Sequence, residues 1–165
     1  MLGEELDKVF NFQSDEHFMR EALKLATRAF DAEEVPVGAV VVHQGRIVAR
    51  AHNQTEQLKD ATAHAEMIAI TQASSALGDW RLAECTLYVT KEPCPMCAGA
   101  AVLSRIQRLV FGVGDEKMGA AGGALNIAND PRFNHRIEVV AGVLADQARA
   151  LLKSFFEEQR KKPKG

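Results

Sequence analysis

Apolar residues recur along this chain with two different periods, and these periods predict the order of its helices and strands. After Ser14, a favourable helix N-cap, apolar residues follow at spacings of three and four, which predicts a helix with one buried face. That face consists of Phe18, Ala22, Leu25, Ala26 and Ala29. We expect it to pack against the core.

Two short β-rich runs, residues 37–42 and 47–51, follow this helix and predict a hairpin. Residues 53–63 are polar and show no period, which indicates a loop. A helical pattern then covers residues 63–76, and Gly78 is expected to end that helix.

A strand, a helix and a second strand are predicted next, at residues 86–90, 95–104 and 109–112. Pro95 suits the first position of the helix, because the N–H that proline lacks would be unpaired there. Two strands joined by such a crossover are expected to be parallel, with a right-handed connection.

The rest of the chain begins with residues 113–136, a long segment without a regular pattern, which is typical of a functional or disordered loop. The sequence pattern predicts a last strand at residues 137–143, and it predicts an amphipathic helix at residues 144–160. The predicted buried stripe of that helix is Ala148, Leu151, Leu152, Phe155 and Phe156. The order of elements predicts an α/β fold in which helices cover a sheet.

The composition is that of an ordinary globular protein and gives no sign of nucleic-acid binding. Of the 165 residues, 47% are hydrophobic and 25% are charged, and the formal net charge is -2. We expect one domain over residues 1–165, with a core at about 14–160 and flexible ends. Because we find neither a signal-peptide pattern nor a run of about 18 apolar residues, we expect a cytoplasmic protein without a membrane partner.

The residues that indicate a catalytic activity lie at the starts of two predicted helices. His64 and Glu66 begin one predicted helix, and Cys94 and Cys97 begin another. An imidazole and two thiols are three zinc ligands, which leave a fourth position open for water, as in a catalytic zinc site. Helix N-termini favour thiolates, and a carboxylate two residues from a ligand can carry protons.

Each half of this cluster also has a simpler explanation. His64 alone is compatible with an ordinary core or surface histidine, and Glu66 alone with a favourable charge on the first turn of a helix. Cys94 and Cys97 alone, in a C-x-x-C arrangement, also suit a redox pair. Metal binding is favoured because both halves occur together. Cys85 lies outside the ligand spacing, and we expect it to be a small buried side chain.

His-x-Glu followed by Pro-Cys-x-x-Cys is the signature of zinc-dependent nucleobase deaminases. Further runs extend the similarity over about residues 14–160, namely 34–40, 62–66, 87–90, 92–100, 104–106, 119–122, 134–136 and 155–156. With these runs the chain resembles the bacterial tRNA-specific adenosine deaminases, which belong to the cytidine/deoxycytidylate deaminase superfamily.

This resemblance implies a three-layer α/β/α cytidine-deaminase-like fold, a five-stranded mixed sheet with helices on both faces. It implies zinc-dependent hydrolytic deamination of adenosine to inosine at the wobble position of a tRNA anticodon. By matching position, the ligands of one Zn²⁺ per subunit would be His64, Cys94 and Cys97. Glu66 would be the catalytic proton carrier while activated water attacks C6 of the adenine.

The resemblance also implies how the base is held. Asn53 matches the family asparagine that contacts the target nucleotide, although an asparagine here also suits an ordinary turn. Val35 and Pro36 would form part of the pocket wall, and the backbone around Ala65 would bind the base through hydrogen bonds.

The implied partner is the anticodon stem-loop of a tRNA, bound by a homodimer whose two subunits both contact the RNA. Asp115 and Lys117 are implied RNA contacts, because their loop borders the anticodon groove of the family. Arg105, Arg108 and the basic residues 160–164 are further candidate phosphate contacts. A charged terminus is also common as a solvated segment.

Three positions depart from the pattern of the family. Ala61 replaces a proline, which is expected to loosen the entry to the zinc helix. Met118 and Gly123 replace a threonine and a serine, which removes two hydroxyl groups from the RNA edge.

Two other functions stay open at this point. A deaminase of a free nucleobase or nucleoside, such as guanine or cytosine, would share every zinc residue. A noncatalytic, zinc-stabilised RNA-binding subunit is of another class, and it would have no need of Glu66 as a proton carrier.

Overall fold

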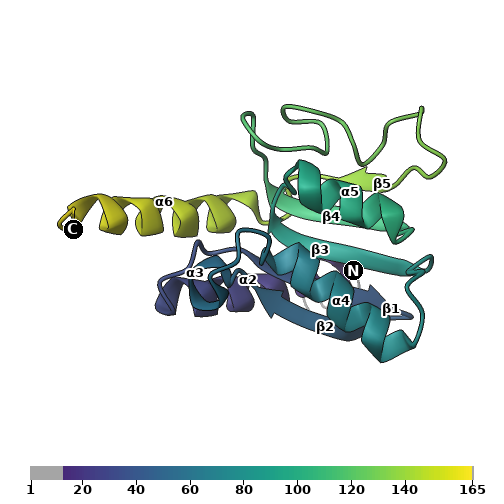
Figure 1. The fold of residues 1–165 in the computed structure, drawn as a ribbon, viewed down its shortest axis with the longest axis horizontal. Coiled ribbons are helices and arrows are strands. Elements are labelled where there is room, and N and C mark those ends of the chain that lie inside the picture. Colours follow the sequence, from purple (N-terminus) through teal and green to yellow (C-terminus); the bar gives the residue numbers. More distant parts are fainter. Residues whose placement is uncertain (1–12, 165) are drawn as a thin grey trace, which may run out of the picture.

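A five-stranded mixed sheet lies between two layers of helices in the computed structural model, which describes residues 13–164 (Figure 1). The strands are β1 (Gly38–His43), β2 (Arg46–His52), β3 (Cys85–Lys91), β4 (Arg108–Val113) and β5 (Glu138–Val140). The helices are α2 (Asp15–Asp31), α3 (Thr55–Leu58), α4 (Ala65–Leu77), α5 (Pro95–Leu103) and α6 (Ala145–Lys161). The predicted fold class is confirmed. Residues 1–12 and 165 of the expected domain lie outside the described residues.

The sheet has the strand order β2-β1-β3-β4-β5. β1 pairs antiparallel with β2 and with β3, whereas β3 pairs parallel with β4, and β4 with β5. The hairpin turns at Gln44 and Gly45, both with positive φ, 51° and 75°, which matches the twist of the two strands. The predicted hairpin and the predicted parallel pair are both confirmed.

Alternation along the strands divides the core into two layers. Val41, Leu87 and Leu109 face the layer that contains α4 and α5, which lie in front of the sheet in Figure 1. Val40 and Val110 face the opposite layer, where α2 and the beginning of α6 pack. Since successive side chains point to opposite faces of a strand, each central strand contributes to both layers.

The predicted helix after Ser14 is confirmed, including its buried face. The hydroxyl of Ser14 accepts a hydrogen bond from the amide of His17 at 3.1 Å, as an N-cap side chain does. All five predicted core residues of α2 are buried, and Met19 is buried with them.

The predicted stripe of α6 is only partly correct. Ala148 and Phe155 are buried and the two leucines are half-buried, but Phe156 is 43% exposed. Adjacent residues of a helix point about 100° apart, and Phe156 lies at the edge of the stripe, where its side chain faces solvent. Neither α6 nor any other helix within residues 13–164 is long and apolar enough to cross a lipid bilayer.

Two further elements differ from the prediction. The last strand covers only Glu138–Val140 instead of residues 137–143, because Gly142 has a φ of 85° and turns the chain away. The loop at residues 53–63 contains the short helix α3, which its polar sequence does not indicate.

Candidate active site

His64 and Cys94 occupy equivalent places in the fold, because each is the N-cap residue of a helix. His64 precedes α4 and Cys94 precedes α5, both with an extended backbone. An N-cap side chain commonly accepts a hydrogen bond from the first amides of its helix, but neither of these side chains does so. Both are therefore available for another interaction.

Three side chains converge where α4 and α5 begin. Nδ1 of His64 lies 3.6 Å from Sγ of Cys94 and 3.5 Å from Sγ of Cys97, and the three ligand atoms all lie within 4.8 Å of one another. With the usual bond lengths of a tetrahedral zinc site, a nitrogen and a sulfur ligand are about 3.6 Å apart. The donor types and their spacing therefore suit zinc.

The protons of these three groups are unequally distributed. The hydrogen bond that the Cys97 thiol donates, together with one from His64, lowers the pKa of Cys94 to about 3. Hydrogen bonding to Cys94 and burial raise the pKa of Cys97, and hydrogen bonding to Cys94 raises the pKa of His64. Of the two thiols, Cys94 therefore loses its proton more readily, and metal binding would release the proton of Cys97.

Glu66 is the second residue of α4, and its carboxyl group lies beside the cluster. The residue is 4% exposed, and its side chain interacts with the thiol of Cys97. Burial raises the pKa of this carboxyl group, because a low-dielectric surrounding disfavours its charged form. A carboxyl group with a raised pKa is suited to accept and return a proton.

A cavity of about 310 Å³ opens over this cluster. Seven of the predicted site residues line it, namely Val35, Asn53, His64, Ala65, Glu66, Cys94 and Asp115. Cys97 is fully buried. Pro36 and Lys117 do not belong to the lining, and their contacts with a substrate stay predictions.

Asn53 is held in the cavity wall by its own backbone and by a neighbouring side chain. Its amide N–H donates to the carbonyl of Val37 at 3.0 Å, and its Nδ2 donates to Oγ1 of Thr55 at 3.5 Å. Asn53 is only 6% exposed, whereas turn asparagines usually lie at the surface. Its placement favours a binding role over that of an ordinary turn residue.

Glu92 is a residue of the site that the sequence pattern did not single out. Its carboxylate lines the cavity and accepts hydrogen bonds from three backbone amides of the following loop. Oε1 accepts from Asp115 at 3.0 Å, and Oε2 accepts from Ala121 at 3.0 Å and from Gly123 at 2.8 Å. This one side chain therefore fixes the loop on its side of the cavity.

Two glycines allow the loop to approach Glu92 so closely. A Cβ atom at Gly119 would lie 2.3 Å from Cδ of Glu92, and one at Gly123 would lie 2.2 Å from the carbonyl oxygen of Asp115. Neither separation is possible without a shift of the backbone. The departure at Gly123 thus does more than remove a hydroxyl group, because this loop conformation requires glycine there.

Glu34 plays a similar part on the opposite side of the cavity. Its buried carboxylate accepts hydrogen bonds from the first amides of α3, those of Glu56 at 3.2 Å and Gln57 at 2.8 Å. Anionic groups stabilise a helix N-terminus in this way. Because the capping residue lies more than twenty positions away, no local pattern could have revealed α3.

The turn that leads to His64 contains the departure at Ala61. Oδ1 of Asp60 accepts hydrogen bonds from the amide of Thr62 at 2.8 Å and from its hydroxyl at 2.7 Å. An Asx turn of this kind restrains the backbone without a proline. The loosening expected from the loss of proline stays a prediction.

The candidate phosphate contacts at Arg105 and Arg108 have partners within the protein. The guanidinium of Arg108 forms two hydrogen bonds with Asp15, at 2.8 and 2.7 Å, and that of Arg105 donates to carbonyls at the end of α5. In the basic tail, Nζ of Lys162 lies 2.6 Å from Oε1 of Glu33. These three cations therefore already have partners within the protein, which weakens their case as RNA contacts.

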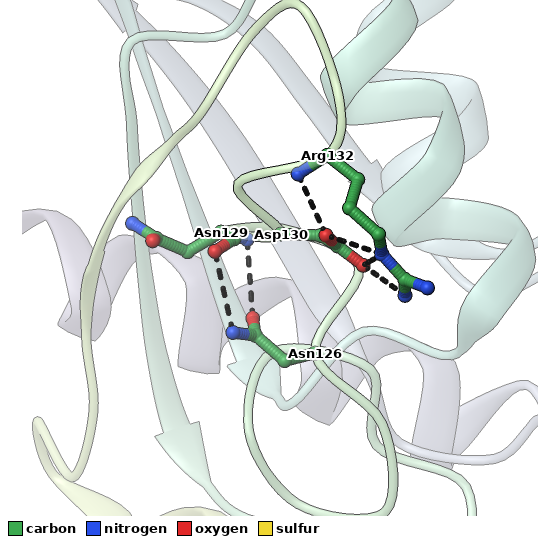
Figure 2. A network of polar contacts seen from close by, with 4 residues as sticks. All are labelled: Asn126, Asn129, Asp130 and Arg132. Atoms are coloured by element: carbon green, nitrogen blue, oxygen red, sulfur yellow. Dashed lines mark hydrogen bonds and ion pairs between the residues drawn. The ribbon is translucent and has the colours of Figure 1, made fainter.

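The second half of the long loop is held by polar contacts of its own (Figure 2). The side chain of Asn126 accepts a hydrogen bond from the amide of Asn129 at 3.1 Å and donates to its carbonyl at 3.3 Å. Asp130 binds the guanidinium of Arg132, with the shortest contact at 2.6 Å. The segment is thus an ordered part of the fold, although it has almost no regular secondary structure.

Comparison with known proteins agrees with this site. The family model of the MafB19-like deaminases matches residues 13–160. The tRNA-specific adenosine deaminase of Bacillus subtilis (strain 168) is 53% identical over 150 residues, which cover 91% of this chain and 93% of that protein.

Solved structures show the same architecture. One, from work on A-to-I editing by tRNA:A34 deaminases at the wobble position of transfer RNA, has a TM-score of 0.79 and 43% identity, covering 82% of this chain and 99% of that chain. A guanine deaminase from Nitrosomonas europaea has a TM-score of 0.73 and 28% identity, covering 86% and 84%. The fold is thus shared by deaminases of different substrates.

Glu92→Gln is expected to lower the free energy of unfolding by about 1–3 kcal/mol. The side-chain NH₂ of glutamine would replace one of the two accepting oxygens, so at least one backbone N–H of the loop would lose its acceptor. Urea denaturation at saturating zinc measures this loss, and hydrogen exchange at Ala121 and Gly123 should become faster. Glu84→Gln is the control, since the side chain of Glu84 is 74% exposed and should change stability by less than about 0.5 kcal/mol. Equal stabilities of the two variants would contradict the anchoring role.

Proposed function

The chain belongs to the tRNA-specific adenosine deaminases, and from that membership we propose how its own residues carry out the reaction. The reaction is hydrolytic deamination of adenosine to inosine at the wobble position of a tRNA anticodon. The proposal rests on one observation, a cavity whose wall brings together metal ligands, a buried carboxyl group and a buried asparagine. Residues 1–165 would act as a single deaminase domain.

Zinc is the proposed cofactor, one ion per subunit, held by His64, Cys94 and Cys97. Two thiolates and an imidazole are a donor set that zinc prefers. Bound there, zinc would supply a Lewis acid that lowers the pKa of water from about 15.7 to about 7. Within residues 13–164 the group consists of three side chains, so a fourth position would be open for water, as catalysis requires.

Glu66 is the proposed proton carrier. During deamination a C–O bond forms at C6 of the adenine and the C6–N bond to the amino group breaks, which yields inosine and ammonia. The Glu66 carboxylate takes a proton from the attacking water, gives it to N1 of the base, and later assists protonation of the leaving amino group. Its burial beside the proposed ligands supports this role, because the proton carrier must lie next to the attacking water.

The base would be held by the cavity wall. Val35 supplies an apolar surface, and Asn53 supplies an amide group that can donate and accept hydrogen bonds. Ala65 is the first residue of α4, where backbone amides have no partner within the helix. Pro36, Asp115 and Lys117 are proposed to contact the nucleotide or its neighbours.

An anticodon loop suits a cavity of this kind. A base must leave its stack to enter, and a single-stranded loop presents the base already unpaired, which lowers the free energy of access. We propose that the enzyme acts in the cytoplasm, where tRNAs take part in translation.

A homodimer is proposed on the basis of the exposed side of α5. Leu103 is 70% exposed, and one turn before it a Cβ atom at Gly99 would meet no atom within 4 Å. An exposed leucine beside an open glycine surface is suited to close packing with a second subunit.

Substrate class is decided by incubating the zinc-loaded protein with a minimal anticodon stem-loop and, separately, with free adenosine, guanine and cytosine. We expect inosine in the stem-loop and no ammonia from the free compounds, because the cavity wall would bind the base only weakly without its flanking nucleotides. Ammonia from a free base alone would instead favour the nucleobase deaminase.

Glu66→Ala should abolish inosine formation while the protein keeps one zinc per chain, because the carboxyl group carries protons and is not a ligand. Inductively coupled plasma mass spectrometry measures the metal, and a single-turnover assay measures the product. Normal turnover in this variant would remove Glu66 from the mechanism, and absence of zinc from the unaltered protein would remove the proposed metal.

Light scattering of the unaltered protein should give twice the mass of one chain. Leu103→Glu should shift the equilibrium toward the monomer, because two charges would be buried at the contact. Glu84→Gln is the control, since it alters an exposed residue at the start of β3. A monomeric unaltered protein would contradict the proposed dimer.

A further inference from the structure

Lys91 is the last residue of β3, and among the described residues 13–164 it is the only lysine or arginine that lines the cavity. Three carboxyl groups line the same cavity, those of Glu66, Glu92 and Asp115. Nζ of Lys91 lies 3.1 Å from Oδ2 of Asp115. Among the described lining residues, one basic side chain thus lies beside three acidic ones.

The three carboxyl groups are not equivalent. Glu66 is buried and has a raised pKa, and Glu92 uses both oxygens to bind loop amides. Oδ1 of Asp115 accepts hydrogen bonds from the amides of Lys117 and Met118, at 2.9 and 3.1 Å. Only Oδ2 of Asp115 is then left to be compensated, and Lys91 is the group that does so.

Asp115 remains ionised in this setting. Burial by itself raises the pKa of its carboxyl group, but the two backbone hydrogen bonds and Lys91 outweigh burial and lower the pKa below its usual value. A fixed negative charge thus lies on the wall of a cavity that must receive a nucleotide of a polyanion. Without a compensating cation, this charge would repel the phosphates.

Sheet topology makes the contact between these residues short and direct. Lys91 pairs with Val113 in the parallel register of β3 and β4, so the two strands end at the same edge. Asp115 follows Val113 by two residues. Lys91 thus reaches the start of the loop from the strand that also leads to Glu92, the anchor of that loop.

We propose that Lys91 is a positioning residue for RNA binding, which neutralises Asp115 and holds its carboxylate against the cavity wall. This inference rests on the proposed function, because only an anionic substrate requires the compensation. Lys91 acts through Asp115 and does not contact the reacting atoms.

The test compares KM and kcat for the anticodon stem-loop in Lys91→Met, Lys91→Arg and a control, Lys24→Met. Lys24 also forms an ion pair, with Glu21 at 2.8 Å, but on α2, outside the cavity lining. We expect Lys91→Met to raise KM about 5-fold at low salt and to change kcat by less than 2-fold, with the KM effect shrinking at high salt. Lys91→Arg should restore KM to within 2-fold, and Lys24→Met should leave both constants unchanged.

A double variant separates action through Asp115 from action on the RNA itself. In an Asp115→Asn background, Lys91→Met should raise KM by less than 2-fold, because the charge that it compensates is gone. The inference is overturned if Lys91→Met leaves KM unchanged while the unaltered protein is active, or if the two substitutions multiply in the double variant. A stem-loop that even the unaltered protein does not deaminate would overturn the proposed function and this inference with it.

Discussion

The site depends on one geometric constraint, namely that α4 and α5 begin side by side with metal-ligating residues at their N-caps. An N-cap residue flanks the helix, and the first turn of the helix holds its backbone in place. The point from which the side chain of the N-cap residue extends is therefore fixed. His64 and Cys94 use this position to face each other instead of capping their own helices. Cys97 and Glu66 then follow at fixed distances along the two helices, which brings the third candidate ligand and the proposed proton carrier together.

Helix starts alone do not form a pocket, and the walls come from loops that two buried carboxylates hold in place. Glu34 caps α3 on one side, and Glu92 binds three amides of the loop after β4 on the other. A buried carboxylate is stable only if its oxygens have hydrogen-bond partners, and backbone amides provide them here. The same bonds satisfy loop amides that no helix or strand would pair.

What could be predicted from the sequence depended on how far apart the interacting residues lie. The buried face of α2, the hairpin and both metal-binding helix starts follow from spacings of one to four residues, and the structure confirms their placement. Glu34, Glu92 and the pairing of Arg108 with Asp15 act across twenty to ninety positions. Periodicity contains no information on such contacts, so α3 was missed and the pairing of Arg108 with Asp15 was not foreseen.

The net charge of -2 can be reconciled with an RNA substrate if charge is balanced locally instead of over the whole chain. The carboxylate of Glu92 binds loop amides, and that of Asp115 binds two amides and the cation of Lys91. Lys91 and the amide dipoles therefore weaken the negative field that the wall presents to a phosphate. Since salt screens charges beyond about 8 Å at physiological ionic strength, the balance within this cavity matters more for binding than the total charge of the chain.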